Sequence, residues 1–220
     1  MALAGFMGAR KTTLGRDAAR LLGRPFVDLD AAIQQHSGST IAELFERGEG
    51  AFREIEERVA GEVLASPVPA VIALGGGAVL SEATRALLRE RALTVLLDVD
   101  VDTAWGRVGG SRRPLADDRE SFGRLYAERK PVYEEVADAR TTETEGIVLA
   151  AGGVRVETGS LQRLGELVPG DGPVEVVSDA RVAGIHGMDA QLALGARARA
   201  THELAPGEQA KTVESIEALW

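Results

Sequence analysis

The sequence predicts an α/β fold with a central parallel sheet, followed by a second, incomplete α/β segment. Short apolar runs that suit strands alternate with amphipathic stretches that suit helices from the first residues onward. A glycine-rich turn separates the first apolar run from the first amphipathic stretch, and carboxylates or glycines follow later runs. Ligands of parallel sheets bind at the carboxyl ends of the strands, so the residues at these positions are the candidate functional residues.

The elements of the first part follow from these patterns in order. Strands are expected over residues 2–4, 26–30, 70–74 and 93–98, and helices over residues 12–22 and 81–91. A capping box of Thr40 and Glu43 begins a further helix, and an apolar stripe through Phe52 and Val59 marks another. Residues 109–118 are rich in Gly, Ser, Arg, Pro and Asp, which predicts a mobile loop before helical periodicity resumes.

Composition excludes several classes of function. The chain has 220 residues and a formal net charge of -9, which argues against a nucleic-acid partner because phosphate binding needs clustered cations. It has no cysteine, which excludes disulfides and thiolate zinc sites and favours a reducing cytoplasm. No apolar run reaches the roughly 18 to 20 residues that cross a bilayer, and the N-terminus lacks the pattern of a signal peptide. We therefore expect a cytoplasmic protein without a membrane partner.

The segment Gly5-Phe6-Met7-Gly8-Ala9-Arg10-Lys11-Thr12 has the placement of a phosphate-binding loop. It follows a short strand and opens a helix, so its backbone N–H groups can point at phosphate. In such a loop Lys11 reaches the β- and γ-phosphates of ATP, and the Thr12 hydroxyl ligates Mg²⁺. The expected ATP-binding residues of the loop are Gly8, Ala9, Arg10, Lys11, Thr12 and Thr13. The alternative is a glycine-rich turn that binds no ligand.

Arg10 departs from the usual pattern of this loop, which has glycine immediately before the lysine. If the position requires a left-handed backbone, arginine costs about 1 to 2 kcal/mol there relative to glycine. A clash with nucleotide would add to this cost, whereas the guanidinium charge would offset part of it. The sequence therefore raises the question of whether Arg10 impairs ATP binding.

Two further groups follow the predicted second and third strands. Asp28 and Asp30 lie on one side of the expected extended segment, where one carboxylate can serve Mg²⁺ through water and the other can accept a proton from an attacking hydroxyl. The alternative role for Asp30 is a helix N-cap, which is compatible with function. The triplet Gly75-Gly76-Gly77 lets backbone amides approach a polyhydroxylated or anionic ligand, although taken alone it could be a simple turn.

Together with Phe52-Arg53, Arg113-Pro114-Leu115 and Arg129-Lys130-Pro131-Val132-Tyr133, these motifs occur in the order found in shikimate kinases. The chain resembles that family over about residues 1–145, and far more than it resembles gluconate or adenylate kinases. The resemblance implies a P-loop kinase fold, a three-layer sandwich with a central parallel sheet, in a domain of residues 1–148. It also implies ATP-dependent phosphorylation of the 3-hydroxyl of shikimate, with ATP and shikimate as ligands and Mg²⁺ as cofactor.

The resemblance also implies roles for individual residues. Shikimate is expected to contact Asp30, Arg53, Arg129 and the backbone of Gly75, Gly76 and Gly77, with Asp30 positioning the hydroxyl. Guanidinium groups suit a carboxylate substrate, although each arginine could instead be a solvated surface residue. Mg²⁺ is assigned to Thr12 and Asp28. Lys11, Asp30 and Arg113 are the catalytic candidates, and Arg113, or its neighbour Arg112, would close over the ATP phosphates.

Arg10 is one of several departures from the family. The stretch 141–145 offers no arginine near the expected adenine position, and only four residues precede Gly5, so the first strand is short. These departures all lie around ATP. The alternative function is accordingly a catalytically impaired shikimate-binding remnant, disabled by Arg10. A kinase for another metabolite such as gluconate is a further alternative.

Residues 149–220 start a new domain. We expect a strand over 154–156, a helix around Leu161 and Leu167, a strand over 174–177 and a final amphipathic helix reaching Trp220. The stretches Val176-Val177-Ser178-Asp179 and Pro206-Gly207-Glu208-Gln209-Ala210-Lys211-Thr212 resemble the N-terminal part of 3-dehydroquinate synthase, a Rossmann-like NAD-binding domain, from about residue 153. The resemblance implies that the segment is truncated, because the dinucleotide loop, zinc ligands and catalytic lysines of that family would lie beyond Trp220.

Asp179, Glu208 and Lys211 are the candidates for remnant NAD contacts in this segment, with a solvated polar loop as the alternative. His186 and His202 do not form a metal-ligand cluster in the sequence. We therefore expect neither dehydroquinate synthase activity nor NAD binding from this segment.

Overall fold

The computed structural model describes residues 1–108, 118–154, 159–168, 170–207, 210 and 212–217. The chain forms two compact units, Met1–Glu157 and Thr158–Trp220. The predicted boundary after residue 148 falls inside helix α8 (Thr144–Ala151), which packs against α1 (Lys11–Leu22) in the first unit. No helix among the described residues has the length and apolar character needed to span a membrane.

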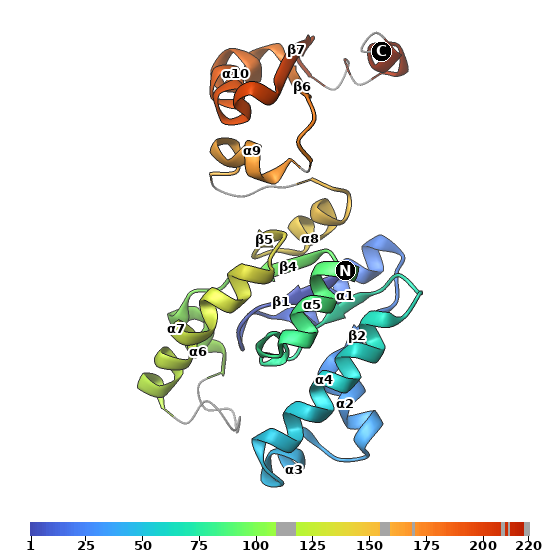
Figure 1. The fold of residues 1–220 in the computed structure, drawn as a ribbon, viewed down its shortest axis with the longest axis vertical. Coiled ribbons are helices and arrows are strands. Elements are labelled where there is room, and N and C mark those ends of the chain that lie inside the picture. The colour runs from blue at the N-terminus through green and yellow to red at the C-terminus, as the bar shows by residue number, and fades with distance from the viewer. Residues whose placement is uncertain (109–117, 155–158, 169, 208–209, 211, 218–220) are drawn as a thin grey trace. The chain divides into compact units, whose positions relative to one another are not determined.

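The first unit is built on a five-stranded parallel sheet with strand order β2-β3-β1-β4-β5 (Figure 1). The strands are β1 Ala2–Ala4, β2 Phe26–Asp28, β3 Val71–Ala73, β4 Thr94–Leu97 and β5 Ala139–Thr141. All residues of the three central strands are buried, as expected for a parallel sheet covered on both faces. The predicted α/β fold with a central parallel sheet is confirmed.

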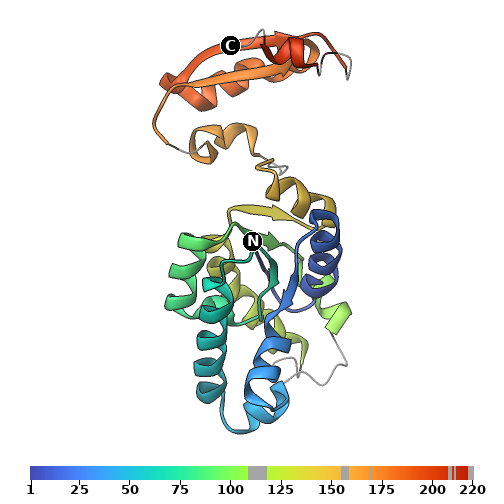
Figure 2. The same cartoon turned by 90° about the vertical axis from the view of Figure 1, so that its right-hand side faces the viewer.

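Helices cover both faces of this sheet, and Figure 2 shows the sheet between α1 on one side and α5 on the other. Besides α1 and α8, the helices of the first unit are α2 Leu29–Ser37, α3 Ile41–Glu46, α4 Glu49–Ala65, α5 Glu82–Arg91, α6 Val101–Val108 and α7 Arg119–Val136, with a short 3₁₀ turn η1 at Ala78–Leu80. The core between these layers contains the fully buried side chains of Leu3, Val71, Val95, Phe122 and Ile147.

Local side-chain bonds fix where several elements begin and end. The capping box of Thr40 and Glu43 is present at the start of α3, as predicted. The expected strand over residues 26–30 is wrong at its end, because β2 stops at Asp28 and Leu29 begins α2. The Asp28 carboxylate accepts a hydrogen bond from the Ala31 N–H at 3.3 Å, so Asp28 is the N-cap and Asp30 lies in the first helical turn.

The second unit contains a parallel strand pair, β6 Val174–Asp179 and β7 Ala198–Leu204, joined by helix α10 Ala180–Leu194. Shorter elements are η2 Leu161–Arg163, α9 Leu164–Leu167, η3 Gly195–Arg197 and α11 Val213–Glu217. The strand predicted over 154–156 begins at Val154, which is in no strand, and its other residues lie outside the described residues. The end of the predicted final helix, including Trp220, also lies outside them.

Candidate active site

A single cavity of about 850 Å³ opens at the carboxyl ends of β1, β2 and β3. It brings the phosphate loop together with residues of α2, α4 and α7 that are distant in sequence. Its walls include Gly8, Arg10, Lys11, Thr12, Thr13, Asp28, Asp30, Phe45, Phe52, Arg53, Glu56, Gly76, Gly77, Arg107 and Arg129. Most of the residues predicted for ATP, Mg²⁺ and substrate therefore line one space.

The phosphate loop follows β1 closely and tolerates no side chain at two of its glycines. Gly5 and Gly8 have positive φ values of 146° and 85°. A Cβ atom on Gly5 would lie 2.7 Å from the Leu97 carbonyl oxygen, and one on Gly8 would lie 2.8 Å from the Ala104 carbonyl oxygen. Glycine is needed at both positions because the loop passes directly against the backbone of neighbouring elements.

Arg10 adopts the left-handed conformation, with φ 64° and ψ 27°, at the N-cap of α1. It is the only non-glycine residue with positive φ in the described part of the chain. The position therefore requires a left-handed backbone, in which arginine costs about 1 to 2 kcal/mol relative to glycine. The side chain is exposed and lines the cavity, so its charge lies beside the expected phosphate position.

Lys11 and Thr12 make specific contacts within the loop. The Lys11 Nζ donates to the carbonyl oxygens of Gly5 at 2.6 Å and Phe6 at 3.2 Å, which holds the ammonium group inside the loop. The Thr12 hydroxyl donates to the Asp28 carboxylate at 2.7 Å. The two residues assigned to Mg²⁺ are therefore adjacent, and both present hard oxygen ligands that suit this ion.

Arg107 was missed by the sequence analysis. Its Nη1 donates to the Gly8 carbonyl oxygen at 2.9 Å, from the last turn of α6. This bond ties α6 to the phosphate loop across 99 residues of sequence. No local pattern could have revealed it, because neither helical spacing nor a motif connects the two positions.

Side chains of the site pack directly against the glycine triplet. A Cβ atom on Gly77 would lie 2.0 Å from Nη1 of Arg53, and one on Gly75 would lie 2.6 Å from Oε1 of Glu56. The Gly76 carbonyl oxygen accepts hydrogen bonds from Nη1 of Arg129, at 3.2 Å, and from the Tyr133 hydroxyl. A side chain at 75 or 77 would therefore displace Glu56 or Arg53 from the end of β3, so glycine at both positions lets these charged side chains reach the backbone.

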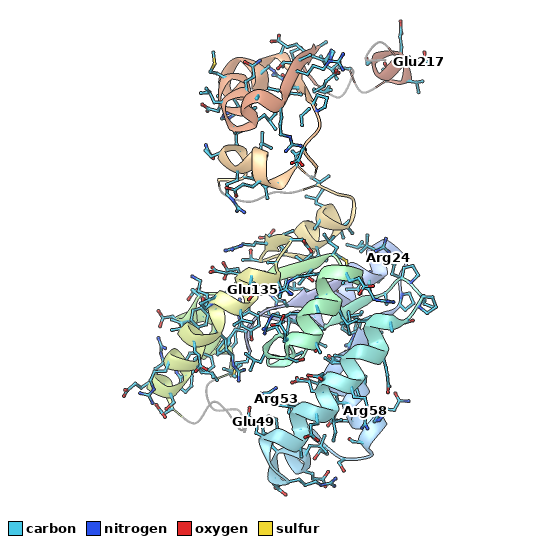
Figure 3. All side chains as sticks on the ribbon, viewed as in Figure 1. Arg24, Glu49, Arg53, Arg58, Glu135 and Glu217 are labelled. Carbon is cyan, nitrogen blue, oxygen red and sulfur yellow. The ribbon has the colours of Figure 1, made fainter. Side chains whose placement is uncertain are left out.

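Arg53 is held on α4 by two carboxylates. Its Nη1 lies 2.6 Å from Oε2 of Glu56, and its Nη2 lies 2.8 Å from Oε1 of Glu49. Figure 3 shows Arg53 and Glu49 next to each other on the same helix. The pair with Glu56 is the more sheltered, because the Glu56 side chain is only 3% exposed. These bonds fix the guanidinium at the cavity wall before any ligand binds.

Burial raises the pKa of the Glu56 carboxyl, and the neighbouring Arg53 opposes this effect. Asp30 raises the same pKa further, while Arg129 lowers it. Four charged side chains therefore interact at this end of the cavity. Sequence analysis also missed Glu56, although a signal existed: it occupies the buried face of α4 together with Phe52 and Val59, where a carboxylate needs a partner.

The structure brings Asp30, Arg53, Gly76, Gly77 and Arg129 to the wall of the cavity that contains the phosphate loop. Gly75 lies next to the carboxylates of Asp30 and Glu56, and Ala9 is buried in the phosphate loop. Arg112 and Arg113 lie outside the described residues.

Of the three candidates of the second unit, Asp179 lies among the described residues. Asp179 is the N-cap of α10, where its carboxylate accepts hydrogen bonds from the N–H groups of Arg181 at 2.8 Å and Gly207 at 3.1 Å. These hydrogen bonds lower the pKa of the Asp179 carboxyl, and the bond from the Arg181 N–H has the largest effect. Glu208 and Lys211 lie outside the described residues. The contacts of Asp179 are those of a structural cap.

Across one cavity, a phosphate loop with its lysine and a Thr–Asp pair faces the buried Arg129 and the partly buried Arg53. This arrangement defines a phosphotransferase that acts on a small anionic acceptor. The model of the shikimate kinase family matches residues 7–151, which lie within the first unit. The chain belongs to the shikimate kinase family, whose members phosphorylate shikimate with ATP.

Individual relatives agree with this assignment. The shikimate kinase of Salinibacter ruber is 42% identical over 146 residues, a match that covers 60% of this chain and 71% of the relative. That of Ruegeria pomeroyi is 43% identical over 138 residues, covering 60% and 70%. Among solved structures, the Acinetobacter baumannii shikimate kinase in complex with shikimate has a TM-score of 0.66 and 33% identity, covering 69% of this chain and 92% of that one.

Proposed function

We propose that this chain transfers the γ-phosphoryl group of ATP to the 3-hydroxyl group of shikimate. One observation carries the proposal: the phosphate loop and the cluster of Asp30, Arg53 and Arg129 line the same cavity. A donor phosphate and an acceptor hydroxyl can therefore be held close together in one cavity, and such positioning is a main part of catalysis in phosphoryl transfer. Membership of the shikimate kinase family supports the same reaction.

ATP is assigned to the phosphate loop. The loop amides of Gly8 to Thr13 and the Lys11 ammonium bind the β- and γ-phosphates, and Arg107 holds the loop in place through the Gly8 carbonyl. Mg²⁺ would be held by Thr12 and Asp28, and when bound it supplies charge neutralisation for the transferring phosphoryl group. Arg113 is proposed to cover the phosphates from the segment between α6 and α7.

Shikimate is assigned to the opposite end of the cavity. Its carboxylate would pair with Arg53 and Arg129, which are held by Glu56 and by the Gly76 carbonyl, respectively. Its ring would lie against the glycine triplet. Asp30, at the start of α2 and on the same wall, would accept the proton of the attacking hydroxyl. The shikimate complex of the A. baumannii enzyme supports this choice of acceptor.

Arg10 favours a second candidate function, a shikimate-binding protein with impaired turnover. The left-handed backbone at Arg10 shows that a strained arginine stands where the loop usually has glycine. Its position at the cavity wall is compatible with either an added phosphate contact or an obstruction.

The test measures ADP release from Mg-ATP with and without shikimate, on this chain, on Arg10→Gly and on Arg10→Ala. We expect shikimate-dependent turnover in all three, with Arg10→Gly more stable than this chain by about 1 kcal/mol because glycine adopts the left-handed conformation freely. Arg10→Ala retains the backbone strain and removes the charge, so it separates the two effects. Turnover only in Arg10→Gly would favour the impaired protein, and no turnover in any variant would contradict the kinase assignment.

For residues 149–220, we propose a fragment equivalent to the N-terminal part of 3-dehydroquinate synthase, without synthase activity. The parallel β6–α10–β7 unit and the hydrogen bond that the Gly207 N–H donates to the Asp179 carboxylate support this proposal. Calorimetric titration with NAD tests it, with no binding expected at millimolar NAD. Saturable NAD binding that Asp179→Ala abolishes would overturn the expectation that the fragment does not bind the cofactor.

A further inference from the structure

Tyr133 is a buried tyrosine whose hydroxyl reaches the backbone of the proposed shikimate site. Its side chain is 3% exposed, and its hydroxyl donates to the Gly76 carbonyl oxygen from one turn beyond Arg129 on α7. The ring packs edge-on against Phe6, with centroids 6.5 Å apart. The position of the hydroxyl is therefore fixed by core packing and does not depend on a ligand.

We infer that Tyr133 is a positioning residue for the substrate-binding glycines. In a trans peptide the carbonyl of one residue and the N–H of the next point in opposite directions. A hydrogen bond that holds the Gly76 carbonyl toward α7 therefore turns the Gly77 N–H away from α7. Gly76 and Gly77 both line the cavity, so the orientation of this peptide sets what the backbone presents to shikimate.

Arg129 cannot replace Tyr133 in this role. The hydrogen bond from Arg129 to the Gly76 carbonyl oxygen, at 3.2 Å, is longer than the one from the Tyr133 hydroxyl. The proposed function also requires the Arg129 guanidinium to bind the shikimate carboxylate. The Tyr133 hydroxyl also interacts with the Arg129 side chain, so it supports both the Gly76 carbonyl and the arginine assigned to the shikimate carboxylate. Burial raises the pKa of Tyr133 to about 12, so the hydroxyl keeps its proton and remains a donor at neutral pH.

The chain provides a matched control, because Tyr126 lies on the same helix and makes the same kind of bond elsewhere. Its hydroxyl donates to the Val99 carbonyl oxygen at 2.9 Å, and its ring also packs edge-on against Phe6, at 5.3 Å. Tyr133→Phe and Tyr126→Phe therefore each remove one hydroxyl from α7. The two variants differ in whether the lost bond reaches the glycine triplet.

The experiment compares steady-state kinetics and the calorimetric Kd for shikimate in this chain and the two variants. Loss of one backbone hydrogen bond in Tyr133→Phe should raise KM and Kd for shikimate by about 2- to 12-fold, with KM for ATP unchanged. Tyr126→Phe should leave both shikimate constants unchanged. The melting temperature serves as the structural readout, and we expect it to fall further in Tyr133→Phe, because Tyr133 is buried and Tyr126 is partly exposed.

Two results would overturn the inference: unchanged shikimate constants in Tyr133→Phe, or equal weakening of shikimate binding in both variants. The role inferred for Tyr133 rests on the proposed function, and different measurements would contradict the role and the function. Absence of shikimate-dependent ADP release in this chain contradicts the kinase assignment, whereas the calorimetric Kd for shikimate tests Tyr133 even if turnover is lost.

Discussion

The two units use the same βα connectivity, yet among the described residues the first has an extended buried core and the second has few buried apolar side chains. In the first unit the strands β1, β3 and β4 are buried along their whole length. In the second, Ala190 and Leu194 are the buried apolar residues among those described. Helix α10 instead exposes a stripe of large apolar side chains, Ile185 at 72%, Met188 at 69% and Leu192 at 72%. Connectivity alone therefore does not create a stable domain.

The number of strands explains the difference. The central strand β1 has a parallel neighbour on each side, so helices on both faces can cover a wide sheet. The pair β6 and β7 is only two strands wide, and alternate residues such as Val177 remain about half exposed. A two-stranded sheet is marginal in water without further packing. We infer that the chemistry and most of the stability belong to the first unit.

The largest expected effect is on catalysis. The test compares substitutions of two aspartates that lie at the starts of helices, Asp30 in the first unit and Asp179 in the second. Asp30→Asn removes the carboxylate proposed to take the proton of the attacking hydroxyl, and should lower kcat by about 10²- to 10⁴-fold. Asp179→Asn changes a structural cap in the second unit and should leave kinase activity unchanged. Initial rates at saturating ATP and shikimate measure both. An equal loss of activity in the two variants would show that the units are functionally coupled.

The next effect is on stability and compares a buried residue with an exposed one. Phe122 is fully buried and packs edge-on against Phe6 and Trp105, at 5.1 and 5.2 Å. Phe122→Ala should lower the free energy of unfolding by about 3 to 5 kcal/mol through the cavity it leaves. Ile185→Ala on the exposed face of α10 should change it by less than about 0.5 kcal/mol.

Urea unfolding followed by tryptophan fluorescence measures the effect of Phe122→Ala on the first unit, and far-UV circular dichroism in the same titration, which follows the helices of both units, measures the effect of Ile185→Ala. The chain has two tryptophans, so a Trp220→Phe background leaves Trp105 as the probe of the first unit. Activity measured along the same titration provides an independent probe of that unit. A large loss of stability in Ile185→Ala would contradict the contrast, because it would mean that the α10 face is covered in solution.

Much of the first unit could be predicted because its signals are local. Apolar runs located β1, β2, β3 and β4 to within one or two residues, but β5 at Ala139–Thr141 was not predicted. The capping box of Thr40 and Glu43 located the start of α3. The phosphate loop and the strain at Arg10 also followed from a short motif. The end of β2 was predicted wrongly because an aspartate after a strand can either extend it or cap a helix, and Asp28 caps α2.

The residues whose roles in the site were not predicted act through distant contacts. Tyr133 reaches Gly76 across 57 residues, and Arg107 reaches Gly8 across 99. Such pairs are set by how the helices pack, which no local pattern encodes. Glu56 is the exception, since its place on the buried face of α4 was readable from helical spacing. The sequence therefore predicted which chemistry the site contains better than it predicted what holds the site in position.

The smallest expected effect is on the pH dependence of stability. It tests how tightly the first unit is closed around Tyr133, a tyrosine buried in its core. Burial raises the pKa of the Tyr133 hydroxyl from 10.0 to about 12, so the folded state binds this proton more tightly than the unfolded state. The associated stability is fully present below about pH 10 and is lost as the pH rises through about 12. The free energy of unfolding of this chain should therefore be lower by about 1.4 kcal/mol at pH 11 than at pH 9. Tyr133→Phe has no hydroxyl to titrate at this position, so this part of the pH dependence should be absent from the variant.

The measurement is the free energy of urea unfolding at pH 9 and pH 11 in this chain and in Tyr133→Phe. Groups that titrate in both proteins cancel in the difference between the two pH dependences, so the difference reports Tyr133 alone. Burial also raises the pKa of Tyr126, which is present in both proteins and cancels in the same way. Identical pH dependences would show that the Tyr133 hydroxyl is solvated in solution, and the first unit would then be less tightly closed around its site than the buried strands indicate.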